Sequence, residues 1–470
     1  MELTDLTIKQ AHEGLKNGDF TSVDLTKAYL ENIKKFDGEI NAYLLVDEAG
    51  ALSQAKEADE KIKTKEFGIL CGIPCVIKDA ILVKDLKCTA ASKILENYVA
   101  SYDATVIEKL KKEGAVILGK ANTDEFTMGA SGENSAFGVT KNPNDKTRVA
   151  GGSSSGSAAA VAANMAVYAL GSDTGGSIRL PSSFCGITGL CPTYGSVSRY
   201  GLIAHASSLD QIGPMAKNVE DAEIVFKAIS GRDKMDATSV DYNYKEEKIS
   251  LEGLKIGIPK EYFAEGLDQE VEKVIRGAIK KAEDAGAEIV DINLPNSKYA
   301  IACYYIIVPS EASANLARFD GIRYGLSEKG EDLLDVYLKS KGHGFGSEPK
   351  RRILTGTYCL SSGYYDAYYK KAQEVRQLIR QDFTDAFGRV DLIFCPVSPF
   401  PAFKIGEKAD DPLSMYLVDA YTGSMKLAGL PGLSLPAGKI GDLPVGLQII
   451  GNHFEENKIL AIAKELESIL

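Results

Sequence analysis

The first part of the chain has the hydrophobic spacing of amphipathic helices. Between residues 5 and 64, apolar residues such as Tyr29 and Ile33 recur three or four positions apart, and charged residues separate them. Residues at this spacing share one face of a helix, so the pattern predicts helices over this segment. Thr21 or Ser22 can cap the second of these helices, because a hydroxyl there can accept a bond from a free amide of the first turn.

From residue 68 the pattern changes to short apolar runs, as at residues 73–77 and 115–118, each ended by polar residues or glycine. Helical segments lie between such runs, which is typical of an α/β sheet. The same alternation continues later in the chain, where an amphipathic helix closes the sequence. The predicted later helices cover residues 268–285 and 360–386, and the strand-like runs cover 255–258, 392–395, 432–435 and 444–450.

Composition narrows the class of protein. The chain has 470 residues, of which 44% are hydrophobic and 25% charged, as in globular proteins with an extensive core. It lacks an apolar run of about 18 residues and a secretory leader pattern, so we expect neither a membrane protein nor a secreted one. The polar stretch 232–248 predicts a surface connection.

Cysteine usage and charge bear on location and partners. The 8 cysteines lie in apolar surroundings without paired CxxC spacing, which favours reduced core thiols in a cytoplasmic protein over metal ligands. The formal net charge of -11 repels phosphate backbones on average. If a nucleic acid is involved, we expect another chain to hold it.

Two short motifs match known patterns without the local structure that those patterns need. Residues 114–121 (GAVILGKA) nearly match the phosphate loop GxxxxGK[ST], but Ala121 replaces its hydroxyl and the inner residues favour a strand. Residues 152–156 (GSSSG) match the nucleophile elbow GxSxG around Ser154. That elbow needs a buried strand before it, whereas residues 142–148 predict a polar loop.

A serine–histidine–aspartate triad lacks a well-placed histidine. His12 and His453 lie in charged terminal segments, His343 lies in a glycine-rich segment that predicts a flexible loop, and His205 follows a short apolar run as a partly buried side chain. Residues 53–56 match SxxK, but their charged amphipathic surroundings favour a surface helix. A serine nucleophile would therefore need a base other than histidine.

Three segments place reactive side chains in backbone settings that serve no obvious structural need. They are residues 72–79 (GIPCVIKD), where Lys78 ends an apolar run, 151–157 (GGSSSGS) and 171–179 (GSDTGGSIR). Each has an ordinary alternative: the lysine can extend to solvent, small residues can pack a helix closely on a sheet, and paired glycines can form a simple turn. Adjacent glycines also let backbone amides point inward, as an oxyanion site requires.

A lysine in an apolar setting can activate a serine. Serine at its ordinary acidity is a weak nucleophile and needs a neighbouring base. A free lysine has a pKa of about 10.4, so a base near neutrality requires a pKa lowered by about three units, which burial or nearby cations can supply. The apolar run before Lys78 offers such an environment.

Together, the three segments resemble the amidase signature family. The resemblance implies an α/β fold with a large mixed β-sheet covered on both faces by helices. It also implies a Ser–Ser–Lys triad whose middle serine follows a cis peptide bond. At the matching positions, Ser177 is the nucleophile, Ser153 the relay serine and Lys78 the base. The matching oxyanion hole consists of the backbone amides of Thr174, Gly175, Gly176 and Ser177.

The resemblance covers nearly the whole chain and narrows to the A subunits of tRNA-dependent amidotransferases. It is carried by residues 124–129 (DEFTMG), 192–199, 207–214 (SSLDQIGP), 310–325 and 361–369. It implies that the chain hydrolyses glutamine to glutamate and ammonia, with Tyr304, Arg352 and Asp419 as substrate-binding residues. An arginine and an aspartate complement the α-carboxylate and the α-ammonium of glutamine.

The same resemblance implies partners and a domain organisation. B and C subunits complete a heterotrimer, and the B subunit uses ATP and magnesium to activate Glu-tRNA(Gln), or Asp-tRNA(Asn), for the ammonia. We expect no metal or cofactor in this chain, and only an indirect contact with tRNA. We predict one domain over residues 1–470, with a helical segment at about 1–64, a catalytic core at about 65–220 and a helical layer or insertion at about 250–390.

Two alternatives stay open: a stand-alone amidase acting on other amides, and a noncatalytic scaffold that retains the fold. Three positions depart from the family pattern without removing a catalytic group. Ser155 stands where glycine is usual, Ala80 where asparagine is common, and Cys191 where lysine is frequent. Ser155 puts the local backbone in question, because a residue with a Cβ disfavours a glycine-only conformation.

Overall fold

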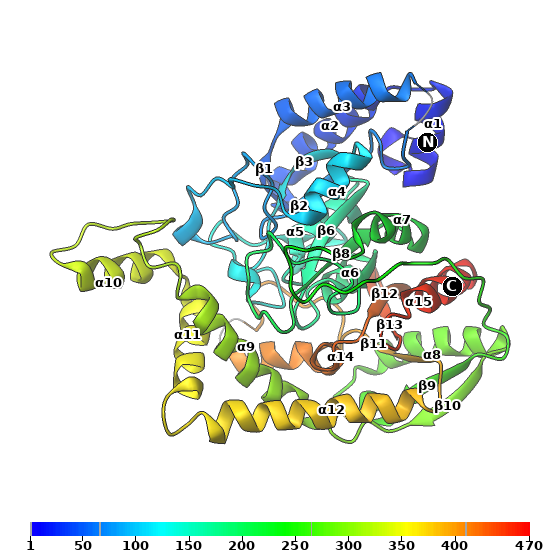
Figure 1. Ribbon diagram of the computed structural model, residues 1–470. Helices are drawn as coiled ribbons and strands as arrows, with labels where there is room; N and C mark the ends of the chain where they lie inside the picture. Colours follow the sequence, from blue (N-terminus) through cyan, green and yellow to red (C-terminus); the bar gives the residue numbers. More distant parts are fainter. Residues whose placement is uncertain (1, 65–66, 265, 409–410) are drawn as a thin grey trace.

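One mixed β-sheet organises the computed structural model, which describes residues 2–64, 67–264, 266–408 and 411–470 (Figure 1). Within the described residues the sheet has 11 strands. In their order across the sheet they are β1 (Tyr43–Val46), β3 (Val116–Ala121), β2 (Pro74–Lys78), β6 (Tyr168–Asp173), β8 (Gln211–Ala216), β7 (Thr188–Cys191), β12 (Gly432–Ile440), β13 (Leu443–Ile450), β11 (Leu392–Pro396), β9 (Lys255–Pro259) and β10 (Glu288–Ile292). The predicted mixed sheet is confirmed.

Helices cover both faces of this sheet, as predicted. Strand β2 runs parallel to both of its neighbours, β3 and β6. Helix α4 (Thr105–Glu113) connects β2 to β3, and α5 (Ser155–Ala162) leads back past β2 to β6. Because such crossovers are right-handed and these two move in opposite directions, α4 and α5 lie on opposite faces. Helix α6 (Arg179–Cys185) packs with α5, whereas α7 (Val219–Ile229) packs with α4.

The N-terminal segment is helical, as predicted, with one exception. Its helices are α1 (Ile8–Asn17), α2 (Ser22–Ile40) and α3 (Glu48–Ile62). Thr21 caps α2, and its side chain accepts a hydrogen bond from the amide of Asp24. The helical prediction is wrong for β1, which pairs antiparallel with β3 at the edge of the sheet. Four residues are too few to display an alternating pattern, and their pairing partner lies far along the chain.

The second half of the chain adds a layer of helices beside the end of the sheet that carries β11 (Figure 1). The helices of this half are α8 (Gln269–Asp284), α9 (Ala300–Leu316), α10 (Leu333–Gly344), α11 (Ser347–Leu360), α12 (Lys371–Phe387), α13 (Pro412–Tyr416), α14 (Gly423–Ala428) and α15 (Glu456–Ile469). The helical prediction for residues 360–386 is confirmed from Asp366 onward, where a π-helical turn, Asp366–Lys370, leads into α12, and is wrong for residues 361–365, because α11 ends at Leu360. The flexible loop predicted around His343 is also wrong, since this residue lies in α10.

Two connecting segments complete the comparison with the predicted elements. Residues 232–248 have neither helix nor strand, in agreement with the predicted connection. Residues 142–148 are not a plain polar loop, because β4 (Lys141–Asn142) and β5 (Asp145–Val149) form a two-stranded hairpin there. None of the helices among the described residues combines the length and apolar character that crossing a bilayer requires. The predicted single domain with three parts stays a prediction.

A buried ion pair joins the neighbouring strands β2 and β3 close to their carboxyl ends. Lys120 Nζ lies 3.0 Å from Asp79 Oδ1, and the two side chains are 0% and 2% exposed. Lys120 also donates to the carbonyl of Ile81 at 2.8 Å, and Asp79 Oδ2 accepts the amide of Thr89 at 2.9 Å. Each charge therefore depends on the other for its stability in the core.

We predict that Asp79→Ala lowers the apparent free energy of unfolding by about 3–5 kcal/mol, because it leaves the ammonium of Lys120 buried without a counter-charge. Lys34→Ala is the control, since it removes an exposed pair with Glu48 and should cost about 0–1 kcal/mol. Chemical denaturation of both variants measures the difference. Equal costs for the two variants would contradict the stabilising role of the buried pair.

Candidate active site

Lys78 ends strand β2 and brings its amine to a group of serine hydroxyls. Its Nζ donates to Ser153 Oγ at 2.7 Å, to Ser154 Oγ at 2.9 Å and to the carbonyl of Ser172 at 3.3 Å. Lys78 is fully buried, so the predicted alternative of an extended, solvated lysine does not hold. Because β2, β3 and β6 are parallel, their carboxyl ends meet at one edge of the sheet, and the segments that follow them converge there.

Burial determines the acidity of this amine. It lowers the pKa of Lys78 to about 7, although the carboxyls of Asp124, Asp173 and Asp210 raise it in part. Desolvation disfavours the charged form of a lysine, and no carboxylate of the described residues forms an ion pair with this one at short range. An amine with such a pKa can accept and return a proton near neutral pH.

The serine segment before α5 has an unusual backbone. The Gly152–Ser153 peptide bond is cis, as the family resemblance implied. The amide of Ser154 donates to the carbonyl of Ser177 at 3.1 Å, so this segment contacts the turn that follows β6. Ser155 lies in α5 without a left-handed backbone, and its Oγ is 3.3 Å from Thr140 Oγ1. The departure from glycine at position 155 therefore causes no conformational conflict.

The turn between β6 and α6 carries Ser177 behind two glycines. Gly176 has φ of 147°, which favours glycine. A Cβ on Gly175 would collide with the hydroxyl of Tyr304, and a Cβ on Gly176 would collide with the side chain of Thr422. The two glycines thus permit other elements to approach the backbone of the turn closely. They also bring Tyr304, on α9, beside it.

Two buried carboxylates hold this turn. Asp173 accepts the amide of Ile178 and the Nε of Arg179, each at 3.1 Å. Burial opposes the charge on Asp173, but the guanidinium of Arg179 keeps the pKa of this carboxyl below its ordinary value. Asp210 Oδ1 accepts the hydroxyl of Thr174 at 2.7 Å. The sequence pattern does not mark Asp173, Arg179 or Asp210 as positioning residues. The charges of Asp173 and Arg179 inside an otherwise small and apolar segment were the available signal, because buried charges need partners.

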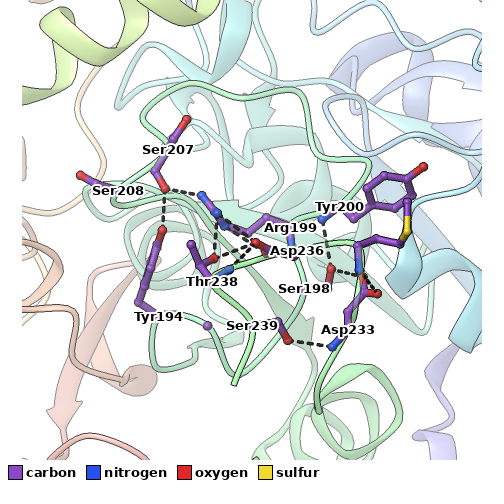
Figure 2. Close-up of polar contacts among 12 residues, drawn as sticks. Tyr194, Ser198, Arg199, Tyr200, Ser207, Ser208, Asp233, Asp236, Thr238 and Ser239 are labelled. Atoms are coloured by element: carbon purple, nitrogen blue, oxygen red, sulfur yellow. Dashed lines mark hydrogen bonds and ion pairs between the residues drawn. The ribbon is translucent and has the colours of Figure 1, made fainter. Parts of the chain in front are cut away.

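A network of polar contacts lies behind Asp210, and Figure 2 shows Arg199 at its centre. The Arg199 guanidinium forms an ion pair with Asp236 at 3.1 Å, donates to Thr238 Oγ1 at 2.8 Å, and also donates to the carbonyl of Ser207 (Figure 2). Ser207 and Asp210 belong to one loop, whereas Asp236 and Thr238 belong to the connection at residues 232–248. This connection therefore supports the loop that holds the turn of Ser177.

The three predicted substrate-binding residues come together from distant elements. Tyr304 on α9 neighbours Tyr305, which donates from its hydroxyl to Asp419 Oδ2 at 2.8 Å. Arg352 on α11 lies with its Cζ 5.3 Å from the centre of the Tyr305 ring. A cavity of about 250 Å³ is lined by Tyr305 and Arg352 together with Glu348 and Tyr416, among others. Tyr305 and Glu348 are contacts that the sequence did not reveal.

Comparisons with known proteins agree with this geometry. Residues 24–460 match the family described as Amidase. This chain belongs to the amidase family. A relative from Thermoanaerobacter pseudethanolicus, named as the A subunit of glutamyl-tRNA(Gln) amidotransferase, is 56% identical over 474 residues, which are 99% of this chain and 97% of the relative. The protein of the same name from Koribacter versatilis is 53% identical and covers 100% of this chain and 99% of its own.

Solved structures give the same family assignment. The A subunit of glutamyl-tRNA(Gln) amidotransferase from Thermotoga maritima superposes with a TM-score of 0.84 at 42% identity, covering 100% of this amidase and 95% of that chain. A peptide amidase from Stenotrophomonas maltophilia superposes with a TM-score of 0.84 at 29% identity, covering 99% and 96%. The fold is thus shared between amidotransferase subunits and amidases that act on other substrates.

Three features of the sequence that lie outside the proposed triad have structural surroundings of their own in this amidase: the near-match to a phosphate loop, His205 and Cys191. Residues 116–121 form β3, and Lys120 is paired with Asp79, so the predicted absence of a phosphate loop at this place agrees with a strand. His205 is fully buried instead of partly buried, and its Nδ1 lies 3.1 Å from Thr127 Oγ1. Cys191 has the amine of Lys426 3.5 Å from its Sγ, so a lysine from another element occupies the space beside this position.

We predict that Lys78 makes the stability of this amidase depend on pH above neutrality. Its pKa is about 7 in the folded state and 10.5 in its ordinary state, so the unfolded chain binds one more proton within this window. The free energy of unfolding of the wild type, relative to Lys78→Met, should therefore rise as the pH increases from about 7 to about 10.5. Chemical denaturation at several pH values measures this difference.

Lys27→Met is the control, because Lys27 is exposed on α2 and its side chain meets solvent in both states. Its difference from the wild type should stay constant over the same window. A constant difference for Lys78→Met as well would contradict a buried, easily deprotonated amine.

Proposed function

We propose that this amidase is the glutaminase subunit of a tRNA-dependent amidotransferase and hydrolyses glutamine to glutamate and ammonia. The observation that carries the proposal is the hydrogen bond of 2.7 Å between the buried Lys78 amine and Ser153 Oγ, beside the turn of Ser177. The identity of 56% to the A subunit of a glutamyl-tRNA(Gln) amidotransferase supports the choice of substrate. The triad Lys78, Ser153 and Ser177 is part of this proposal.

In the first half of the reaction, Ser177 Oγ attacks the side-chain amide carbon of glutamine. Its proton passes to Ser153 Oγ while the proton of Ser153 passes to the neutral amine of Lys78. The backbone amides from Thr174 to Ser177 stabilise the oxyanion, held by the contact of Thr174 with Asp210. Return of the proton to the amide nitrogen breaks the C–N bond and releases ammonia, leaving a glutamyl ester on Ser177.

In the second half of the reaction, water enters after ammonia has left and acts as the nucleophile. The same relay removes a proton from the water as it attacks the ester, and the bond to Ser177 Oγ then breaks. Glutamate leaves, and Ser177 recovers its proton. Lys78 ends the cycle neutral, so a pKa of about 7 suits both directions of the transfer.

The two opposite charges beside Tyr305 suit an α-amino acid. We propose that Arg352 binds the α-carboxylate of glutamine, that Asp419 binds its α-ammonium, and that Tyr304 contacts the substrate beside the Ser177 turn. Arg352 and Asp419 are largely buried, with 4% and 8% exposure, which strengthens charge–charge contacts with a bound ligand.

The proposed partners are the B and C subunits of a heterotrimer in the cytoplasm. Ammonia passes to the B subunit, which uses ATP and magnesium to activate the glutamate or aspartate on tRNA. All eight cysteines of this chain are free and buried, which agrees with a reducing compartment. The formal net charge of -11 agrees with a tRNA held by another subunit.

We predict that Ser177→Ala lowers glutaminase turnover by about 10⁴-fold or more, because no other hydroxyl takes over the attack. Ser182→Ala is the matched control: this serine lies nearby on α6, and its hydroxyl has no hydrogen-bond partner among the described residues. Ammonia release by the purified variants measures the effect. An unchanged thermal unfolding midpoint for Ser177→Ala shows that its fold is intact.

Retained turnover in a folded Ser177→Ala variant would refute the nucleophile. The likeness to the Stenotrophomonas peptide amidase keeps a stand-alone amidase as the second candidate. Preference for aryl or peptide amides over glutamine, without copurifying subunits, would favour that candidate. Absence of ammonia release and of labelling by a glutamine-like electrophile in the wild-type complex would favour a noncatalytic scaffold.

A further inference from the structure

Two opposite charges that are distant in the sequence meet at one aromatic side chain. Arg352 comes from α11, Asp419 ends a short helical turn, Leu417–Asp419, and Tyr305 lies on α9. Helices α9 and α11 pack side by side (Figure 1). The hydroxyl of Tyr305 donates to Asp419 Oδ2 at 2.8 Å, while the guanidinium of Arg352 lies 5.3 Å above the ring. One side chain therefore touches both charged groups.

The position of this ring is itself fixed. Tyr305 stacks on Tyr416 with centroids 3.8 Å apart and an angle of 22° between the planes. Arg352 Cζ lies 5.9 Å from the centre of the Tyr416 ring, so the guanidinium faces both aromatic rings. Such stacking and cation–π contacts hold a guanidinium in one orientation. The size of the rigid Tyr305 side chain then sets the distance between the guanidinium of Arg352 and the carboxylate of Asp419.

Glu348 holds the guanidinium from its other edge. Arg352 Nε donates to Glu348 Oε1 at 2.8 Å, and the hydroxyl of Tyr416 donates to the same oxygen at 3.2 Å. Among the described residues, Nε is the only nitrogen of Arg352 with a hydrogen-bond partner. A guanidinium has five N–H donors, so the four N–H groups on its two outer nitrogens are left for a ligand, and one from each can bind a carboxylate. Both Glu348 and Arg352 line the cavity of about 250 Å³.

We infer that Tyr305 is a positioning residue that sets the spacing between Arg352 and Asp419 and thereby selects amides that carry an ammonium and a carboxylate on the same carbon. This inference rests on the proposed function and adds the residue that determines its specificity. Neither charge alone distinguishes glutamine from a simple acid or amine. Arg352 and Asp419 held at a fixed distance distinguish glutamine, because only a substrate whose carboxylate and ammonium have the matching spacing can bind both side chains.

The ionisation of Asp419 makes the role of Tyr305 measurable as a pH dependence. Burial raises the pKa of Asp419 to about 7, whereas the hydrogen bond from Tyr305 and the charge of Arg352 lower it. More distant charges act in both directions, since Asp173 raises this pKa and Arg179 lowers it. Removal of the Tyr305 hydroxyl therefore keeps Asp419 protonated to higher pH. A protonated Asp419 attracts an ammonium much less strongly.

Tyr305→Phe tests the inference, because it keeps the ring and removes only the hydroxyl. In an assay of the complex with the proposed B and C subunits, we expect KM for glutamine to rise roughly 10-fold or more at pH 7 with little change in kcat, since a hydrogen bond to a charged group is lost. We also expect KM to fall again toward the wild-type value at higher pH. For the monoamide of glutaric acid, which lacks the ammonium, KM should change less than about twofold. Tyr299→Phe, at a residue 47% exposed, is the control.

A double-mutant cycle with Asp419→Asn separates positioning from a general loosening of the site. If Tyr305 acts through Asp419, then Tyr305→Phe adds little to the effect of Asp419→Asn on KM for glutamine. Independent effects of the two changes, or equal KM increases for glutamine and the monoamide, would overturn the inference. Normal KM for glutamine in Tyr305→Phe would do so as well. Failure of the wild type to hydrolyse glutamine would instead overturn the proposed function.

Discussion

The buried amine of Lys78 is the constraint on which the site depends. An ammonium in this position is disfavoured because it loses its hydration, and its contacts are hydroxyls and a carbonyl instead of a nearby carboxylate. Those contacts suit a neutral or transiently charged amine. The carboxyls of Asp124, Asp173 and Asp210 lie close enough to raise the pKa of Lys78 without forming an ion pair, which leaves it at about 7. The site thus contains a buried amine that can accept a proton near neutral pH, in the apolar setting that the run before Lys78 predicts.

The sheet brings the other groups to this amine. Parallel strands β2, β3 and β6 end at the same edge, so the chain after each of them enters one region. Ser153, after the cis bond, and Ser154 bring their hydroxyls to Lys78, and the amide of Ser154 contacts the carbonyl of Ser177, so the turn that carries Ser177 lies beside the serine segment. The buried carboxylates of Asp173 and Asp210 then hold the Ser177 turn by hydrogen bonds to Ile178 and Thr174. The cavity of about 250 Å³ belongs to a different layer, since helices α9 and α11 supply Tyr305 and Arg352.

The sequence predicted the parts of the fold that have a local cause. Periodicity located the strands β2, β3, β9, β11, β12 and β13 and the helices α1, α2, α3, α8, α12 and α15, and the hydroxyl of Thr21 caps α2 as expected. It failed where the cause is distant, as at β1, which pairs with β3 far along the chain. The same division applies to the site. Lys78, Ser153 and Ser177 stand out in glycine-rich or strand-end segments, whereas the roles of Tyr305, Asp210 and Glu348 depend on partners many residues away and have no sequence signal of their own.

The pH dependence of kcat/KM for glutamine tests most directly whether Lys78 is the base. We expect kcat/KM to rise with pH near 7 and then level off, because the amine of Lys78 must be neutral to accept a proton and, in the proposed site, the carboxyl of Asp419, whose pKa is also about 7, must be charged to bind the ammonium of glutamine. The part of this rise that belongs to Lys78 should shift strongly with temperature, as amine ionisations do, whereas the carboxyls of Asp419 and of Asp124, whose pKa burial raises to about 6, should shift little. A profile that stays flat from pH 6 to 9, or a midpoint that does not move with temperature, would contradict a lysine base.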